Sequence, residues 1–140
     1  MSKEKILALD GKLSQQRTEW SNKIKELAQS LRHLNTLEAT IADVLSSRQM
    51  LIDQIAYINV KVKEQKAKLN SRYRDAYIRY YEYDYKLAEK QKERFIENDL
   101  EADNIILSHL ENQLDFFRES VKTLDNMGFA IRNRLALKDL

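Results

Sequence analysis

The chain has 140 residues, of which 43% are hydrophobic and 33% are charged, and its formal net charge is +2. It contains no cysteine, which excludes disulfides and thiolate metal sites, and it has no apolar run near the roughly 18 to 20 residues of a membrane span. Proline is absent and the only glycines are Gly11 and Gly128, so the residues that tight turns require are missing. These features predict a single all-α domain in the cytoplasm that makes no membrane contact.

Apolar residues recur at helical spacing along most of the chain. Gly11 is expected to interrupt a short helical turn over residues 2–9. With Ile24 at position a, fifteen of the twenty a and d positions as far as Lys90 are apolar or aromatic. The a positions include Leu45, Ile52, Tyr73 and Tyr80. Three or four such heptads already favour a coiled coil, so the pattern predicts a long coiled-coil-forming helical region over residues 1–97. Two pairs are candidate breaks in it: Ser46-Ser47 and Asn70-Ser71.

A second apolar seam follows a predicted chain reversal near residues 96–99. Asn98 is a suitable N-cap and Asp99 suits the first turn of a helix, so a second, antiparallel helix is expected over 98–127. Gly128 is expected to end it as a C′ residue, and a short C-terminal helix would cover 128–140. Because a two-helix hairpin would expose much of its apolar seam, we expect a homo-oligomer.

Candidate catalytic residues are scarce. His33 and His109 are the only histidines, and neither lies in a metal-binding spacing such as E-x-x-H or H-E-x-x-H. The chain has no glycine-rich phosphate loop and no nucleophile elbow. We therefore expect neither a cofactor, a metal nor catalytic residues, and the alternative of a helical enzyme lacks a converging site.

Residues 61–86 combine positive charge with aromatic rings. Six of the seven tyrosines lie here. Residues 61–79 include seven basic residues and only two acidic ones, which gives a local charge of +5. Bases stack on aromatic rings while cations follow the phosphates, so interleaved basic and aromatic side chains are what binding of single-stranded nucleic acid requires.

The tyrosines divide between two predicted faces of the helix. Tyr73, Tyr80 and Tyr83 fall on the a/d seam, where a core role is the simpler interpretation. The other face carries Tyr77, Tyr81 and Tyr85 together with Arg74 and Ile78. Composition alone leaves this face equally suited to nucleic acid and to a protein partner.

The C-terminal part of the chain carries a resemblance. The segment from Leu114 to Asn133 reads LDFFRESVKTLDNMGFAIRN, and residues 78–81 read IRYY. Both stretches resemble the UvsY-type recombination mediators of T-even-like bacteriophages, which share the G-F-x-I-basic signature and a basic residue next to paired tyrosines. The resemblance covers roughly the last 60 residues. The family has a longer, glycine-containing connection after the tyrosines, which this chain lacks.

The resemblance implies a phage recombination mediator in the host cytoplasm. Such a protein forms a homo-oligomer, binds single-stranded DNA, and helps to load a RecA-like recombinase onto strands covered by single-strand-binding protein. It would place Arg79, Tyr80 and Tyr81 in the DNA-contacting stretch, and Gly128, Phe129 and Ile131 in the assembly region.

Residues and resemblance together define two predicted sites. The predicted DNA-binding residues are Lys61, Lys63, Lys66, Lys68, Arg72, Arg74, Tyr77, Arg79, Tyr80, Tyr81 and Tyr85. The predicted oligomerisation residues are Leu107, Leu114, Phe117, Val121, Leu124, Gly128, Phe129 and Ile131. The rival hypothesis is a structural or adaptor coiled coil, such as a phage assembly factor or a host-takeover inhibitor, whose tyrosine-rich face binds a protein.

Overall fold

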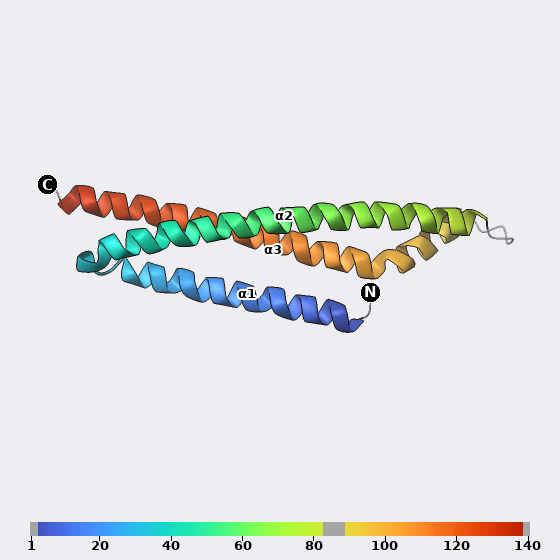
Figure 1. Cartoon of the computed structure of the whole chain (residues 1–140), viewed down its shortest axis with the longest axis horizontal. Coiled ribbons are helices and arrows are strands. Elements are labelled where there is room, and N and C mark those ends of the chain that lie inside the picture. Colours follow the sequence, from blue (N-terminus) through green and yellow to red (C-terminus); the bar gives the residue numbers. More distant parts are fainter. Residues whose placement is uncertain (1–2, 83–88, 139–140) are drawn as a thin grey trace.

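The computed structural model describes residues 3–82 and 89–138, and these residues form helices packed side by side (Figure 1). The elements are α1 (Lys3–Ser30), the short 3₁₀-helix η1 (Leu34–Thr36), α2 (Leu37–Tyr81) and α3 (Glu89–Lys138). The described part of the chain contains no β-strand, which confirms the all-α prediction. None of its helices is long and apolar enough to cross a membrane.

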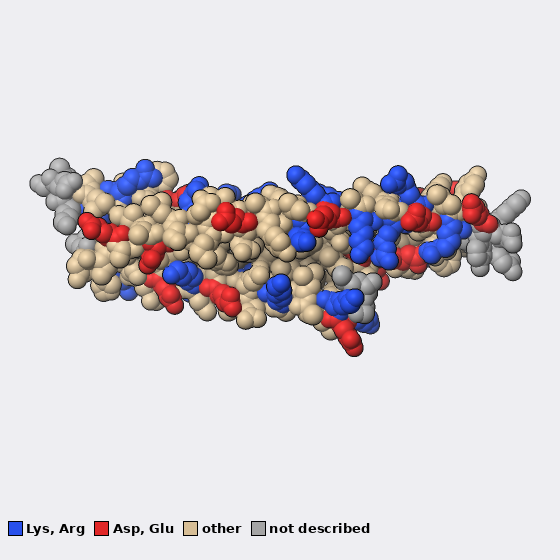
Figure 2. All heavy atoms as spheres, viewed as in Figure 1, with Lys and Arg blue, Asp and Glu red and all other residues tan. Residues whose placement is uncertain are grey.

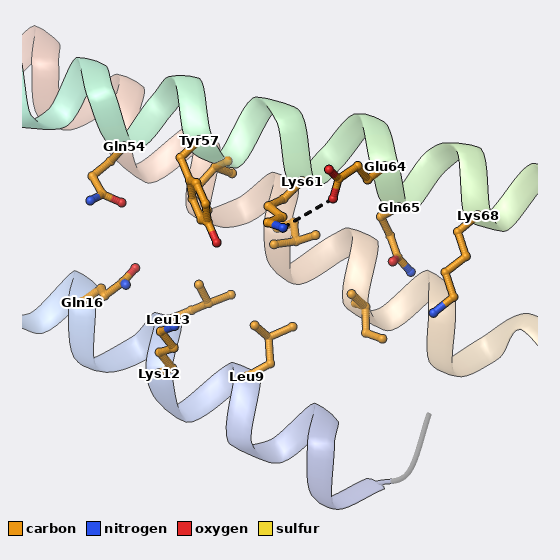
Figure 3. Close-up of a pocket in the computed structure, with 13 residues that line it drawn as sticks. Leu9, Lys12, Leu13, Gln16, Gln54, Tyr57, Lys61, Glu64, Gln65 and Lys68 are labelled. Atoms are coloured by element: carbon orange, nitrogen blue, oxygen red, sulfur yellow. Dashed lines mark hydrogen bonds and ion pairs between the residues drawn. The ribbon is translucent and has the colours of Figure 1, made fainter.

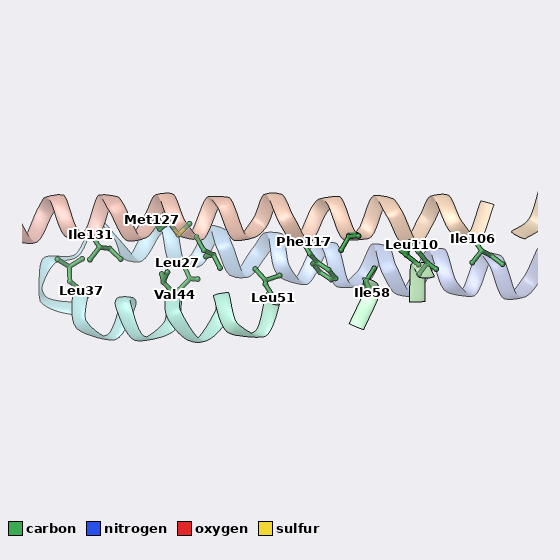
Figure 4. Packing of buried hydrophobic residues seen from close by; sticks show 13 residues of the cluster. Leu27, Leu37, Val44, Leu51, Ile58, Ile106, Leu110, Phe117, Met127 and Ile131 are labelled. Carbon is green, nitrogen blue, oxygen red and sulfur yellow. The ribbon is translucent and has the colours of Figure 1, made fainter. Parts of the chain in front are cut away.

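The main core lies where all three helices meet (Figure 4). Leu27 of α1, Leu51 of α2 and Phe117 of α3 are almost completely buried there. The remaining buried members of this cluster are Leu37, Val44, Ile58, Val62, Ile106, Leu110, Leu114, Leu124, Met127 and Ile131. The spacing of three, four and seven residues along each helix places them on one stripe, which the antiparallel pairing of α2 and α3 buries.

Helix α1 is much shorter than its neighbours, so it covers only part of their length (Figure 1). Beyond the N-terminal end of α1, the last part of α2 and the first part of α3 continue as a two-helix hairpin (Figure 1). We call it the hairpin extension (residues 69–82 and 89–103), and it has a core of its own. Its apolar core is small and consists of Ala76, Ile96 and Leu100, with Leu69 and Tyr80 packed against it. Polar contacts therefore carry a larger share of the packing here than in the main core.

The predicted helix boundaries were wrong in several places. The helical region breaks at residues 31–36, and neither serine pair breaks it. There Leu31, Arg32 and His33 donate backbone hydrogen bonds to carbonyls three residues back, which tightens the end of α1. The heptad pattern runs through this turn, so it gave no signal of the break.

The two glycines and the predicted cap at Asn98 were also misread. Helix α1 passes through Gly11, and α3 runs without a break from Glu89 through Asn98 and Gly128 to Lys138. Neither glycine has a positive φ. A glycine inside a helix costs roughly 1 kcal/mol relative to alanine, which burial of the neighbouring Met127 and Ile131 can offset. The chain therefore reverses between α2 and α3, after Tyr81, and has no separate C-terminal helix.

The predicted heptad register fails in the first half of α2. Leu45, a predicted seam residue, is 62% exposed, whereas the neighbouring Val44 and the residue one heptad later, Leu51, are 4% and 0% exposed. Only from Val62 onward do predicted d positions such as Ala76 become buried. The buried positions therefore shift within α2, between Ile58 and Val62, and a single heptad register does not describe the whole helix. The coiled-coil oligomer therefore stays a prediction.

We predict that Leu51→Ala lowers the free energy of unfolding by about 2–5 kcal/mol, because it leaves a cavity in the main core. The matched control is Leu45→Ala on the same helix, which should change it by less than about 0.5 kcal/mol because Leu45 is exposed. Urea denaturation followed by circular dichroism measures both. Equal losses for the two variants would contradict the register described here.

A second prediction concerns the helical glycines. An added Cβ meets nothing within 4 Å at Gly11 or at Gly128, so alanine at either position should raise the free energy of unfolding by about 0.5–1 kcal/mol. The same denaturation experiment tests this. A clear loss of stability for Gly128→Ala would mean that α3 does not continue as a helix through this position.

Candidate nucleic-acid interface

Helix α2 separates the predicted DNA-binding residues onto different sides. An α-helix turns about 100° per residue, so residues spaced by three, four and seven share a side. Lys63, Lys66, Arg74 and Tyr77 lie on an exposed side that points away from α3. Tyr81 lies at the end of this side, where Lys92 of α3 stands over its ring at 5.1 Å from the centroid. Tyr73 and Ile78 belong to the same side. We call these seven residues the outer face.

The outer face carries positive charge that the fold leaves unneutralised. Lys63, Lys66 and Arg74 are exposed, and none of them forms an ion pair with another residue that the structure describes. Figure 2 shows lysine and arginine side chains gathered over the end of the molecule that holds the hairpin extension, with acidic side chains among them. These three cations are therefore available to an anionic partner.

Three tyrosines form a ladder along the outer face. The rings of Tyr73 and Tyr77 stack with centroids 6.4 Å apart, and those of Tyr77 and Tyr81 with centroids 6.2 Å apart. The side chains remain 47%, 41% and 67% exposed in chain order. An open groove of about 260 Å³ lies beside the ladder, lined by Tyr73, Arg74, Tyr77 and Ile78. Tyr73, for which a core role was the simpler interpretation, is thus a surface residue in this structure.

The opposite side of α2 faces acidic residues of α3. Arg72 donates a hydrogen bond to Asp103 at 2.5 Å, and Lys68 lies 3.9 Å from the same carboxylate. Arg79 pairs with Asp99 in the same way. Three of the predicted DNA-binding cations are thus neutralised within the chain. Asp103 was not among the predicted functional residues, although its spacing of four residues from Asp99 on one helix was a usable signal.

Tyr80 belongs to this neutralised side. Its hydroxyl donates a hydrogen bond of 2.8 Å to Asp99, and its ring stacks on Phe95 with centroids 5.6 Å apart. The hydrogen bond to Asp99, with partial burial and the nearby negative charge, raises the pKa of the Tyr80 phenol above its ordinary value. Tyr80 is therefore half-buried within the hairpin extension, as its seam position predicted.

Lys61 lies on the same side of α2 as Lys68, one heptad earlier, at a level where this side borders a cavity next to α1 (Figure 3). It is 3.4 Å from Glu64 and stands over the ring of Tyr57 at 5.4 Å from its centroid. A cavity of about 340 Å³ opens here between α1 and α2, with Leu9, Leu13 and Gln65 in its wall. Lys61 therefore does not join the outer face, and Tyr85 lies outside the described residues.

Most of the predicted oligomerisation residues pack against other residues of the same chain. Leu114, Phe117, Leu124 and Ile131 are buried in the main core, and Leu107 and Val121 pack against it. Gly128 is half-buried. Phe129 alone of this set is largely exposed, at 59%, with the guanidinium of Arg132 over its ring at 4.8 Å. The apolar pattern that suggested self-association is thus largely satisfied by the three-helix packing.

Metal-binding clusters are absent from the part of the chain that the structure describes, where no three histidine, cysteine, aspartate or glutamate side chains come together. His109 lies 3.6 Å from Asp10 on α1, which gives it a contact between helices.

No protein-family model, no curated protein and no solved structure matches this chain.

Proposed function

We propose that the protein binds single-stranded DNA through the outer face of α2 and has no catalytic role. The single observation that carries the proposal is the exposed tyrosine ladder, flanked by three cations that have no ion-pair partner among the described residues. Every base has a flat face that can stack on a tyrosine, and every phosphate can accept a hydrogen bond from lysine or arginine. Binding of this kind tolerates any base sequence.

The dimensions of the face suit a short stretch of a single strand. Lys63 and Tyr81 are eighteen residues apart on one helix, which corresponds to about 27 Å along its axis. Stacking contributes roughly 1–3 kcal/mol per base, so three rings and three cations form a moderate site on one chain. Several copies acting on one strand would add avidity.

The biological role that we propose is that of a recombination mediator. The resemblance of residues 78–81 and 114–133 to the UvsY-type proteins supports this role. In it, a homo-oligomer would hold single-stranded DNA while a RecA-like recombinase replaces single-strand-binding protein.

A second candidate is an adaptor that docks a protein on the same face. The groove beside Tyr73, Tyr77 and Ile78 favours it, because an exposed isoleucine between tyrosines offers an apolar contact that DNA does not need. Salt separates the two hypotheses, because binding through phosphates weakens steeply as salt rises and apolar docking does not.

We predict that Tyr77→Ala with Tyr81→Ala weakens binding of a labelled single-stranded oligonucleotide by roughly tenfold or more in fluorescence anisotropy, because two stacking surfaces are lost. The free energy of unfolding should change by less than about 1 kcal/mol, since both rings are exposed. Tyr57→Ala is the matched control. Tyr57 is an equally exposed tyrosine on α2 with a lysine over its ring, but it lies on the side facing α1.

Equal weakening by Tyr57→Ala and by the double variant would contradict the assignment of the outer face. A large loss of helical signal in the double variant would show that the ladder serves the fold.

A further inference from the structure

A second row of cations lies next to the outer face. Lys68, Arg72 and Arg79 line the side of α2 that faces α3. Lys68 still borders the cavity next to α1, whereas Arg72 and Arg79 lie farther along α2 and line a separate cleft. An open cleft of about 510 Å³ lies between the two helices at this point. Arg72, Arg79 and Asp99 are among the residues that line it. A ligand can therefore reach these guanidinium groups without separating the helices.

The carboxylates of α3 occupy the positions that phosphates would take. Asp99 and Asp103 are four residues apart, about 6 Å along one side of α3, and each accepts a hydrogen bond from an arginine of α2. Carboxylate and phosphate oxygens bind the arginine fork in the same way. The acidic side of α3 thus satisfies the cations that a nucleic acid would otherwise use.

The two aspartates differ in how firmly they are held. The side chain of Asp103 is completely buried, and among the described residues its Oδ1 has no hydrogen-bond partner, with only Lys68 at 3.9 Å. Replacing it would disturb the packing of α2 on α3. The side chain of Asp99 is 36% exposed and that of its partner Arg79 is 64% exposed, so this ion pair is accessible to solvent at the opening of the cleft. An exposed ion pair is worth little, roughly 0–1 kcal/mol, and a phosphate can compete for Arg79.

We propose that Asp99 is an internal competitor for nucleic acid: it holds Arg79 until a phosphate of the bound strand displaces it, and the cleft then adds a second contact to the outer face. This inference rests on the proposed function, because it concerns the same strand. Asp103, held by Arg72, keeps α2 and α3 in place while the exchange occurs at Asp99. The strand would cross from the tyrosine ladder over the edge of α2 into the cleft.

The test is the affinity of Asp99→Asn for a labelled single-stranded oligonucleotide, measured by anisotropy over a range of salt. The amide keeps the size of the side chain and an oxygen for the Tyr80 hydroxyl, but it loses the charge that holds Arg79. We expect binding several-fold tighter than that of the natural protein. The slope of log K against log salt should stay the same, because Arg79 meets a phosphate in both complexes and only the cost of displacing Asp99 is removed.

Glu101→Gln is the matched control, because it removes the same charge from an exposed residue of α3 that forms no ion pair with another described residue. Asp99→Glu, which keeps the charge, should bind like the natural protein, and adding Arg79→Gln to Asp99→Asn should abolish the gain. Circular dichroism checks that each variant is folded.

Equal effects of Asp99→Asn and Glu101→Gln, or weaker binding by Asp99→Asn, would overturn the inference and leave the proposed function intact. No binding by the natural protein and all variants at low salt would overturn the proposed function, and the inference with it.

Discussion

The antiparallel pairing of α2 with α3 is the constraint on which the rest of the structure depends. Both helices are long, and their apolar stripes bury each other for most of their length. Where α1 joins them, three stripes close around a core that contains Leu51 and Phe117. Past the end of α1 the pair has less to bury, and buried or half-exposed ion pairs take over part of the contact between the helices. The molecule is therefore most polar at the end where the candidate site lies.

This arrangement sorts the charges of α2 by the neighbour that each one meets. Cations that face α3 pair with Asp99 and Asp103. Lys61 pairs with Glu64 of α2 itself. Cations that face away from both helices have no partner within the described residues. A local charge of +5 in the sequence thus becomes a much smaller free charge on one face, and that face is where the tyrosines stack. The separation explains how a chain with a net charge of only +2 can present the exposed, unpaired cations of the proposed site.

The sequence predicts the fold class but not the helix ends. The absence of proline and the three-four spacing of apolar residues were sufficient to predict helices, because both act locally. The end of α1 near Ser30 was not predictable in this way, since the turn after it has no glycine or proline and tightens mainly through backbone hydrogen bonds. Gly128 was wrongly predicted to end a helix. Tertiary packing on both sides of it keeps this weak helix former inside α3.

The candidate site was predictable as a segment, and helical spacing also grouped Arg74, Tyr77, Ile78 and Tyr81 on one face, but it could not show which cations are free. Basic and aromatic residues between 61 and 86 identify the stretch, and helical spacing groups Tyr77 with Tyr81. Whether a cation is free depends on the helix across from it, and the pairing of Arg79 with Asp99 joins residues twenty positions apart on different helices. No local pattern contains that information. The same holds for Tyr73, which a single heptad register assigns to the seam and the structure leaves exposed.

The most direct test of the account is the salt dependence of single-stranded DNA binding by the unaltered chain. Fluorescence anisotropy with a labelled oligonucleotide should be measured between about 50 and 200 mM salt. If Lys63, Lys66 and Arg74 each meet one phosphate, log K should fall with log salt with a slope of about −2, and a fourth phosphate on Arg79 would bring the slope to about −3. An absence of binding at low salt by protein that is folded by circular dichroism would contradict the central claim, and so would binding that does not change with salt.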